Sequence, residues 1–205
     1  MHDRFMPRYR RQMARGRPVF FTVCLADRTS TALLDHLDLL RDAVRVTIKD
    51  RPFEILAWVV LPDHIHAVWR LRASDPDFSQ RWGRIKSRFT RDLRVRLRRP
   101  GLGPDAFPSA LPQNSSGRFA GLKPGLREDR RECAVWQRRF WEHHCRDEAD
   151  LNAHIAYCLM NPVKHGLVAR PTDWMASSIH RDIRLGRLPA DWSGDHIKGN
   201  CGEAA

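Results

Sequence analysis

The sequence predicts an α+β fold in which strands and helices follow one another as β-α-β-β-α-β and form a split βαβ sandwich. Three observations support this fold class. Short runs of β-branched and aromatic residues are typical of strands. The segments between two pairs of these runs repeat apolar residues at helical spacing. A very short turn joins the second and third runs and predicts a hairpin at the centre of the order.

The first half of the chain supplies a strand, a helix and the hairpin. Residues 19–25 are β-branched, aromatic and apolar, which predicts a buried strand. Apolar residues at helical spacing then predict an amphipathic helix that ends before Pro52. These residues are Leu33, Leu37, Leu40, Val44 and Ile48. Residues 53–60 and 64–71 are the next two strands, and residues 61–63 form the turn between them.

The second half supplies two helices and the last strand. A helix is predicted over residues 78–98, and residues 134–142 have the composition of a fourth strand. Asp147 is expected to cap the following helix, with acidic residues in its first turn. This helix is expected to end at about Met160, because the residue before Pro162 avoids the helical region.

The chain divides into three segments by composition. Residues 1–17 form a basic arm, residues 18–162 hold the main domain, and residues 163–205 form a basic extension expected to wrap the domain or a nucleic acid. Residues 100–132 are rich in proline and glycine without sustained periodicity, which predicts a long loop insertion.

The charge of the chain indicates an anionic partner. Its 205 residues carry a formal net charge of +12, mostly as arginine, which suits bidentate phosphate contacts. No segment has the apolar length or amphipathic pattern expected for a membrane. The first residues lack a signal-peptide pattern, so a cytoplasmic location is expected. The 5 cysteines form no C-x-x-C pair and are expected to be reduced.

Two basic segments are predicted to contact a nucleic-acid backbone. The first is the arm, with Arg8, Arg10, Arg11, Arg15 and Arg17. The second is a stripe on the helix over residues 78–98, with Arg81, Arg84, Arg88 and Arg91. Asp92 is the only acidic residue between residues 80 and 99, so we expect these charges to track phosphates. A solvated tail and an ordinary solvated helix face are the alternatives.

Two histidines on the third strand are candidate metal ligands. His64 and His66 are two residues apart, so on a strand they point to the same face. Two neutral imidazoles on one face form half of a metal site. A polar face on a half-buried strand would explain the same pattern.

The helix that follows Asp147 carries a second group of candidates. His154, Tyr157 and Asn161 lie at i, i+3 and i+7, so a hydroxyl nucleophile and an amide oxygen share one helical face. A metal could then be bound by His64, His66 and Asn161, with open positions for water and a phosphate oxygen. A packing role for Tyr157 and a helix stop at Asn161 are the alternatives.

These motifs resemble those of a known family. His64-Ile65-His66 resembles the His-hydrophobe-His motif of the HUH single-tyrosine transposases. Residues 157–168, Tyr-Cys-Leu-Met-Asn-Pro-Val-Lys-His-Gly-Leu-Val, are similar to the tyrosine motif of their REP-associated branch. Flanking stretches fit as well, and the resemblance covers roughly residues 15–192. The longer, proline-rich loop and the Cys-Leu after Tyr157 depart from the family pattern.

The resemblance implies a ferredoxin-like catalytic domain that cleaves and rejoins single-stranded DNA bearing hairpins, such as REP-like palindromes. Tyr157 would form a 5′-phosphotyrosine, His64 and His66 would hold Mg²⁺ or Mn²⁺, and Asn161 would match the third ligand position. Lys164 could contact phosphate just after the helix. A monomer or a homodimer is compatible with the sequence.

Other functions are compatible with parts of the same pattern. A non-enzymatic nucleic-acid-binding regulator could use the same sandwich and the basic helix, and only Tyr157, His64 and His66 argue against it. A relaxase or replication-initiator nuclease would share the chemistry. Those enzymes commonly add a third histidine to the strand motif and have larger chains, and neither feature is present here.

Overall fold

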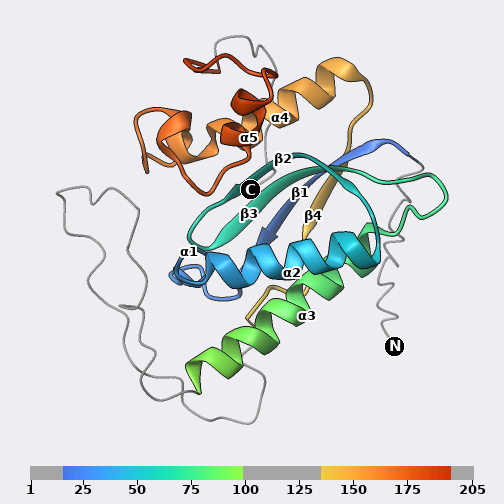
Figure 1. Ribbon diagram of the computed structural model, residues 1–205, viewed down its shortest axis with the longest axis vertical. Helices are drawn as coiled ribbons and strands as arrows, with labels where there is room; N and C mark the ends of the chain where they lie inside the picture. The colour runs from blue at the N-terminus through green and yellow to red at the C-terminus, as the bar shows by residue number, and fades with distance from the viewer. Residues whose placement is uncertain (1–15, 99–134, 195–205) are drawn as a thin grey trace, which may run out of the picture.

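The computed structural model describes residues 16–98 and 135–194. Its centre is a 4-stranded antiparallel sheet with the strand order β2-β3-β1-β4 (Figure 1). The strands are β1 (Pro18–Cys24), β2 (Glu54–Val60), β3 (His64–Arg70) and β4 (Trp141–His144). Because β3 lies between β1 and β2, each β-α-β unit is split by a strand of the other, and the predicted α+β sandwich is confirmed.

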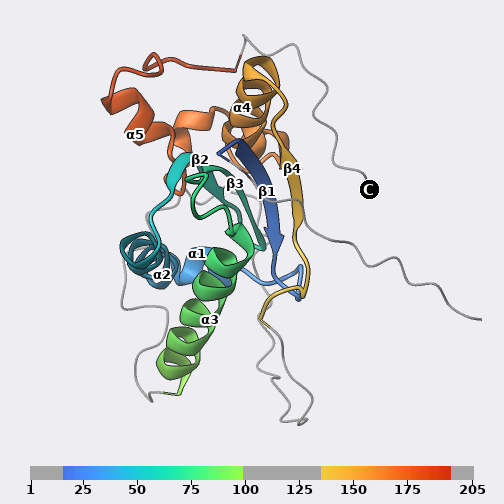
Figure 2. The ribbon, with the colours of Figure 1, turned by 90° about the vertical axis from the view of Figure 1, so that its right-hand side faces the viewer.

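Helices cover both faces of the sheet. On one face lie α1 (Ala32–Asp35), α2 (Leu37–Asp50) and α3 (Phe78–Leu97), with α2 packed against α3. The other face is covered by α4 (Glu148–Lys164), which packs on β2 and β3 (Figure 2). The helix predicted between the first two strands is instead two helices. They are separated at His36, whose φ of −126° is not helical.

Neighbouring residues of β1 show how the two layers are held. Phe21 contacts Trp82 of α3, with ring centres 5.8 Å apart, whereas Phe20 contacts Tyr157 of α4 at 5.7 Å. Adjacent residues of a strand point to opposite faces, so α3 and α4 are bound to opposite sides of β1. The α3 side contains the stacked indoles of Trp69 and Trp82, 4.3 Å apart and both fully buried.

The fourth strand differs from its predicted position. Residues 134–142 were expected to pair, but β4 covers Trp141–His144 and pairs with Val19–Thr22 of β1. The earlier segment makes one isolated bridge, from Trp136 to Leu25. The aromatic residues that suggested a strand are used for packing, because Trp136 is buried against Phe89 at 5.4 Å.

The predicted end of the tyrosine helix is wrong. The helix α4 continues through Pro162 to Lys164, and its last turn is closed by the hydrogen bond from His165 N to Asn161 O. Both Asn161 and Pro162 are buried. Tertiary packing of this turn therefore outweighs the tendency of a residue before proline to avoid the helical region.

The chain after α4 covers the outer edge of β2. It contains a 3₁₀ turn over Pro171–Asp173 and the helix α5 (Ile179–Arg184). Val60 N donates to Ala176 O at 2.9 Å, and Ser178 N donates to Trp58 O at 2.8 Å. These bonds satisfy edge groups that another chain could otherwise pair with. The division at residues 162 and 163 remains a prediction, and α4 crosses it.

Some predictions concern residues that the structure does not describe. The arm residues Arg8, Arg10, Arg11 and Arg15 and the insertion over residues 100–132 lie outside residues 16–98 and 135–194. Within the described ranges, helices are too short or too polar to cross a membrane. Among the described residues, Cys24, Cys145 and Cys158 form no disulfide with one another.

Candidate functional site

The histidine pair lies on the face of β3 that α4 covers. The register places His64 opposite Cys24 and His66 opposite Thr22 of β1, and the two imidazole centres are 4.8 Å apart. The predicted placement of both side chains on one face is therefore confirmed. Both residues are buried, with 5% and 0% of their surface exposed.

Each imidazole is held by a neighbour at its Nδ1 atom. Asp63 Oδ1 is 2.7 Å from His64 Nδ1, and Thr22 Oγ1 is 3.0 Å from His66 Nδ1. A metal would accordingly be bound through the Nε2 atoms, with Asp63 and Thr22 fixing ring orientation from behind. Neither partner was predicted from the sequence. Asp63 directly precedes the motif, whereas Thr22 is brought in only by the β1–β3 register.

Burial controls the protonation of His66. Desolvation lowers the pKa of His66 well below its ordinary value, and the charges of His64, His165 and Lys164 act in the same direction. His66 is therefore neutral at neutral pH, which is the state that binds metals. Burial raises the pKa of Asp63, but its hydrogen bond to His64 and the charges of His64 and Arg28 outweigh burial and hold it below the usual range.

The helix α4 brings Tyr157 to the same place. The Tyr157 ring is half-buried and lies edge-on against His66, with centres 5.4 Å apart. Lys164, two turns later, donates a hydrogen bond from Nζ to the Tyr157 hydroxyl at 3.2 Å, and its ammonium lies 4.6 Å from the ring centre. The phenol oxygen therefore faces a cation that can neutralise charge on it or on a bound phosphate.

Asn161 lies one turn after Tyr157 and is fully buried. Its Nδ2 donates to Tyr157 O at 3.4 Å, and its side chain is close enough to His66 to oppose part of the effect of burial on that pKa. Its Oδ1 atom is buried without a well-aligned donor among the described residues. An amide oxygen beside the His66 imidazole fits a divalent cation, because both atom types are metal ligands.

The stripe on α3 does not form part of this site. The helix α3 covers the opposite face of the sheet, against α2 (Figures 1 and 2). The acidic partner of Arg84 and Arg88 comes from another element, whereas that of Arg91 lies on α3 itself. Asp50 of α2 binds Arg84 and Arg88 at 3.4 and 2.9 Å, and Arg91 pairs with Asp92. Their roles as DNA contacts remain predictions.

The predicted position of Arg81 on an exposed basic face is wrong. It is completely buried, and its guanidinium donates to Asp77 O, Pro52 O and Asp75 Oδ2 at 2.8, 3.1 and 2.9 Å. Helical periodicity placed it on the stripe, but the loop before α3 folds over it. Because all of these contacts are internal, Arg81 acts as a structural residue in this fold.

Other charged residues lie nearer the site or the surface. Lys164 lies at the site as described, and Arg17 is exposed just before β1. His165, exposed at the end of α4, brings its ring centre to 5.3 Å from that of His64.

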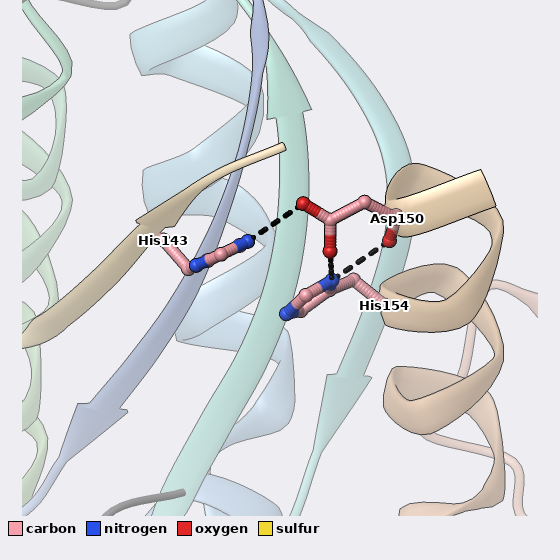
Figure 3. Close-up of side chains that lie close together, drawn as sticks. All are labelled: His143, Asp150 and His154. Carbon is pink, nitrogen blue, oxygen red and sulfur yellow. Dashed lines mark hydrogen bonds and ion pairs between the residues drawn. The ribbon is translucent and has the colours of Figure 1, made fainter. Parts of the chain in front are cut away.

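A second cluster of polar side chains lies on the same face, where β4 meets the first turns of α4. His143 Nε2 and His154 Nδ1 both contact the Asp150 carboxylate, at 2.9 and 3.0 Å (Figure 3). Burial raises the pKa of Asp150, but hydrogen bonds from His143 and Arg146 hold it far below its usual range. Burial lowers the pKa of His154. This group could hold a metal ion.

The fold and the site together define a class of protein. It is an α+β sandwich with a histidine pair on an inner strand and a tyrosine on the covering helix, as expected for HUH-type, single-tyrosine proteins. The chain belongs to the REP-associated tyrosine transposase family, and this is shown by curated relatives.

One relative, from Escherichia coli (strain K12), is named REP-associated tyrosine transposase. It is 39% identical over 198 residues, which cover 97% of this chain and 98% of the relative. A relative from Haemophilus influenzae, whose name places it in the same family, is 38% identical over 198 residues, covering 95% and 99%. A search of protein-family models found no match.

A solved structure agrees with this assignment. It is described as a REP-associated tyrosine transposase bound to a REP hairpin, and it matches with a TM-score of 0.72 and 38% identity. The match covers 98% of this chain and 99% of that one. The family and the α+β fold predicted from the sequence are therefore both confirmed.

Proposed function

We propose that this chain is a metal-dependent single-stranded DNA endonuclease and strand transferase that acts on hairpin DNA, with Tyr157 as its nucleophile. The observation that carries the proposal is the position of Tyr157, whose ring lies beside His66 at 5.4 Å and whose hydroxyl lies beside Lys164 at 3.2 Å. The relative described as bound to a REP hairpin supports palindromic DNA as the substrate.

In the proposed reaction, the Tyr157 oxygen attacks the phosphorus of a phosphodiester and loses its proton. A bond forms between the phenolic oxygen and the 5′-phosphate, and the bond to the 3′-oxygen breaks. That oxygen takes up a proton and leaves as a 3′-hydroxyl. A 3′-hydroxyl can later attack the phosphotyrosine and release Tyr157, so rejoining needs no external energy source.

The remaining residues have supporting roles. A divalent ion, Mg²⁺ or Mn²⁺, bound by His64, His66 and Asn161 would polarise the scissile phosphate as a Lewis acid. Asp63 and Thr22 hold the two imidazoles in orientation, and Lys164 neutralises negative charge at the phenol oxygen or phosphate. Two groups of arginines are proposed to bind the DNA backbone. They are the arm arginines, which include Arg17, and Arg84, Arg88 and Arg91 of α3.

The test is formation of a covalent adduct. The full chain is incubated with hairpin-bearing single-stranded DNA and Mg²⁺, and protein–DNA complexes that survive denaturation are measured. Wild type and Tyr9→Phe, which removes the other of the 2 tyrosines, are expected to form the adduct, whereas Tyr157→Phe is expected to form none. A chelator should also abolish it.

Absence of an adduct with wild type, or its persistence in Tyr157→Phe, would overturn the proposed chemistry. DNA binding without any adduct is the result expected for a non-enzymatic regulator on the same fold. The assay therefore separates the proposed enzyme from the non-enzymatic regulator.

A further inference from the structure

We propose that His143, Asp150 and His154 form a second divalent-metal site, separate from His64 and His66, which binds a transition-metal ion such as Zn²⁺ or Co²⁺. The inference goes beyond the proposed strand-transfer reaction and does not depend on it. The ligands come from two elements, His143 from β4 and the other two residues from the first turns of α4 (Figure 3).

The ligand atoms already converge. His143 Nε2 is 2.9 Å from Asp150 Oδ2, His154 Nδ1 is 3.0 Å from Asp150 Oδ1, and the potential ligand atoms lie within 4.8 Å of one another. Two ligands bound to one tetrahedral ion at about 2.1 Å lie about 3.4 Å apart. The pairs at 2.9 and 3.0 Å are already near this separation, and the widest pair would need to close by at most about 1.4 Å.

The surrounding structure holds these side chains in place. The His143 ring stacks on His154, with centres 4.4 Å apart and planes 14° apart. Asp150 and His154 lie one helical turn apart, and Asp147 caps this turn by accepting from Asp150 N at 2.8 Å. Side-chain exposure is 8% for Asp150 and His154 but 28% for His143, so the cluster is reached from the His143 side.

The donor set determines the kind of ion. Two imidazole nitrogens and one carboxylate oxygen suit transition metals and leave further positions open, whereas Mg²⁺ prefers oxygen ligands. Without metal, the His143 Nε2–H donates to the carboxylate at 2.9 Å, and the His154 Nδ1–H is shared between Asp150 O at 2.8 Å and the carboxylate at 3.0 Å. On binding, the ion replaces these two hydrogens, and each neutral ring carries its proton on the other nitrogen.

The Phe20 ring separates this cluster from the first histidine pair. Its centre is 5.5 Å from that of His66 and 5.1 Å from that of His154. His154 precedes Tyr157 by three residues on α4, so an ion at the cluster would link the beginning of the tyrosine helix to β4. We therefore assign the site a positioning role for α4.

Cobalt binding tests the site without relying on DNA cleavage. The metal-free full chain with His64→Ala and His66→Ala is titrated with Co²⁺ and followed by visible absorption. It is expected to bind about one ion through two nitrogen ligands and one carboxylate. Adding His143→Phe keeps a stacking ring but removes the ligand nitrogen, and should weaken binding at least about 10-fold. Adding His180→Phe, a matched change outside both clusters, should not.

A second measurement, the number of Co²⁺ ions bound per chain, needs no change at His64 or His66. In the otherwise wild-type chain, His143→Phe is expected to lower the number of bound Co²⁺ ions by one while circular dichroism without metal stays unchanged. Equal Co²⁺ affinity with and without His143→Phe would overturn the site. An unchanged number of bound ions, or equal weakening by His180→Phe, would overturn it as well.

Discussion

The Tyr157 ring meets the His66 ring edge-on, with centres 5.4 Å apart and planes 75° apart. This contact joins the helix that carries the proposed nucleophile to the strand that carries the proposed metal ligands. The thiol of Cys158 strengthens the junction by donating to His66 O at 3.4 Å. The position of α4 on β3 therefore determines whether nucleophile and metal ligands can act on the same phosphate.

Thr22 is predicted to affect metal use without taking part in the chemistry. Thr22→Val keeps a β-branched side chain on β1 but removes the oxygen 3.0 Å from His66 Nδ1. Loss of such a supporting contact typically costs about 10- to 100-fold in metal affinity or activity. The Mg²⁺ concentration that gives half-maximal adduct should rise accordingly. Thr29→Val, in an exposed turn, is the control and should leave it unchanged.

Lys164 is predicted to accelerate adduct formation through its charge. Lys164→Gln removes the cation 3.2 Å from the Tyr157 hydroxyl and should slow the reaction about 10-fold, less than a fully buried donor would contribute. Lys164→Arg should restore part of the rate. Single-turnover rates with saturating hairpin DNA measure both, with Lys49→Gln as a control at the end of α2. Equal rates for Lys164→Gln and wild type would contradict this role.

Local periodicity was sufficient to predict part of the site. A strand repeats every two residues and a helix every 3.6, so His64 and His66, and Tyr157 and Asn161, could be assigned to common faces before their elements were placed. The charges on α3 could not be assigned in this way. Their partners Asp50 and Asp75 belong to other elements and are brought close only by packing.

The same distinction explains the errors in element boundaries. Pro162 ends a helix by its local preference, but the buried last turn of α4 overrides that preference. Trp136 has strand-like composition, yet its burial against α3 takes the place of strand pairing. Sequence patterns report local preference, whereas these two positions are decided by contacts across the chain.

Arg81 is predicted to matter for stability, not for DNA affinity. Arg81→Met would remove a buried cation and the hydrogen bonds that it donates to Pro52 O, Asp77 O and Asp75. Breaking a buried charged contact of this kind should lower the free energy of unfolding by about 3 kcal/mol. Urea denaturation measures this loss. Arg84→Met, which removes a partly exposed pair with Asp50, should cost less than about 1 kcal/mol.

Asp75, the carboxylate partner of Arg81, is predicted to make the stability of the protein sensitive to acid. The hydrogen bond from Arg81 holds the pKa of Asp75 below its ordinary value. The stability from this carboxylate is therefore complete above its unfolded pKa of about 3.9 and is lost as the pH falls toward the folded value. A range from about pH 5 to about pH 3 spans this unfolded pKa. Over that range, the free energy of unfolding should fall more for wild type than for Asp75→Asn. Asp42→Asn, which removes an exposed carboxylate within α2, should follow wild type.

Arg181 is predicted to protect the outer edge of the sheet. Its NH1 and NH2 groups donate to the carbonyl oxygens of Ile55 and Leu56 at 2.8 and 3.0 Å, and β2 is the outer strand of the sheet that the described residues form. Arg181→Met keeps most of the side-chain volume but leaves both carbonyls without this donor. Each lost hydrogen bond to a charged group should cost about 1.5 kcal/mol or more.

The exposed edge should also change how the protein associates. A strand edge with unpaired carbonyl groups can pair with another chain, so Arg181→Met is expected to aggregate at lower protein concentration than wild type. Light scattering during storage and urea denaturation measure the two effects. Arg184→Met removes an exposed arginine from the same short helix and should change neither. If both variants lose stability equally, the effect comes from the charge of α5, and edge protection by Arg181 is wrong.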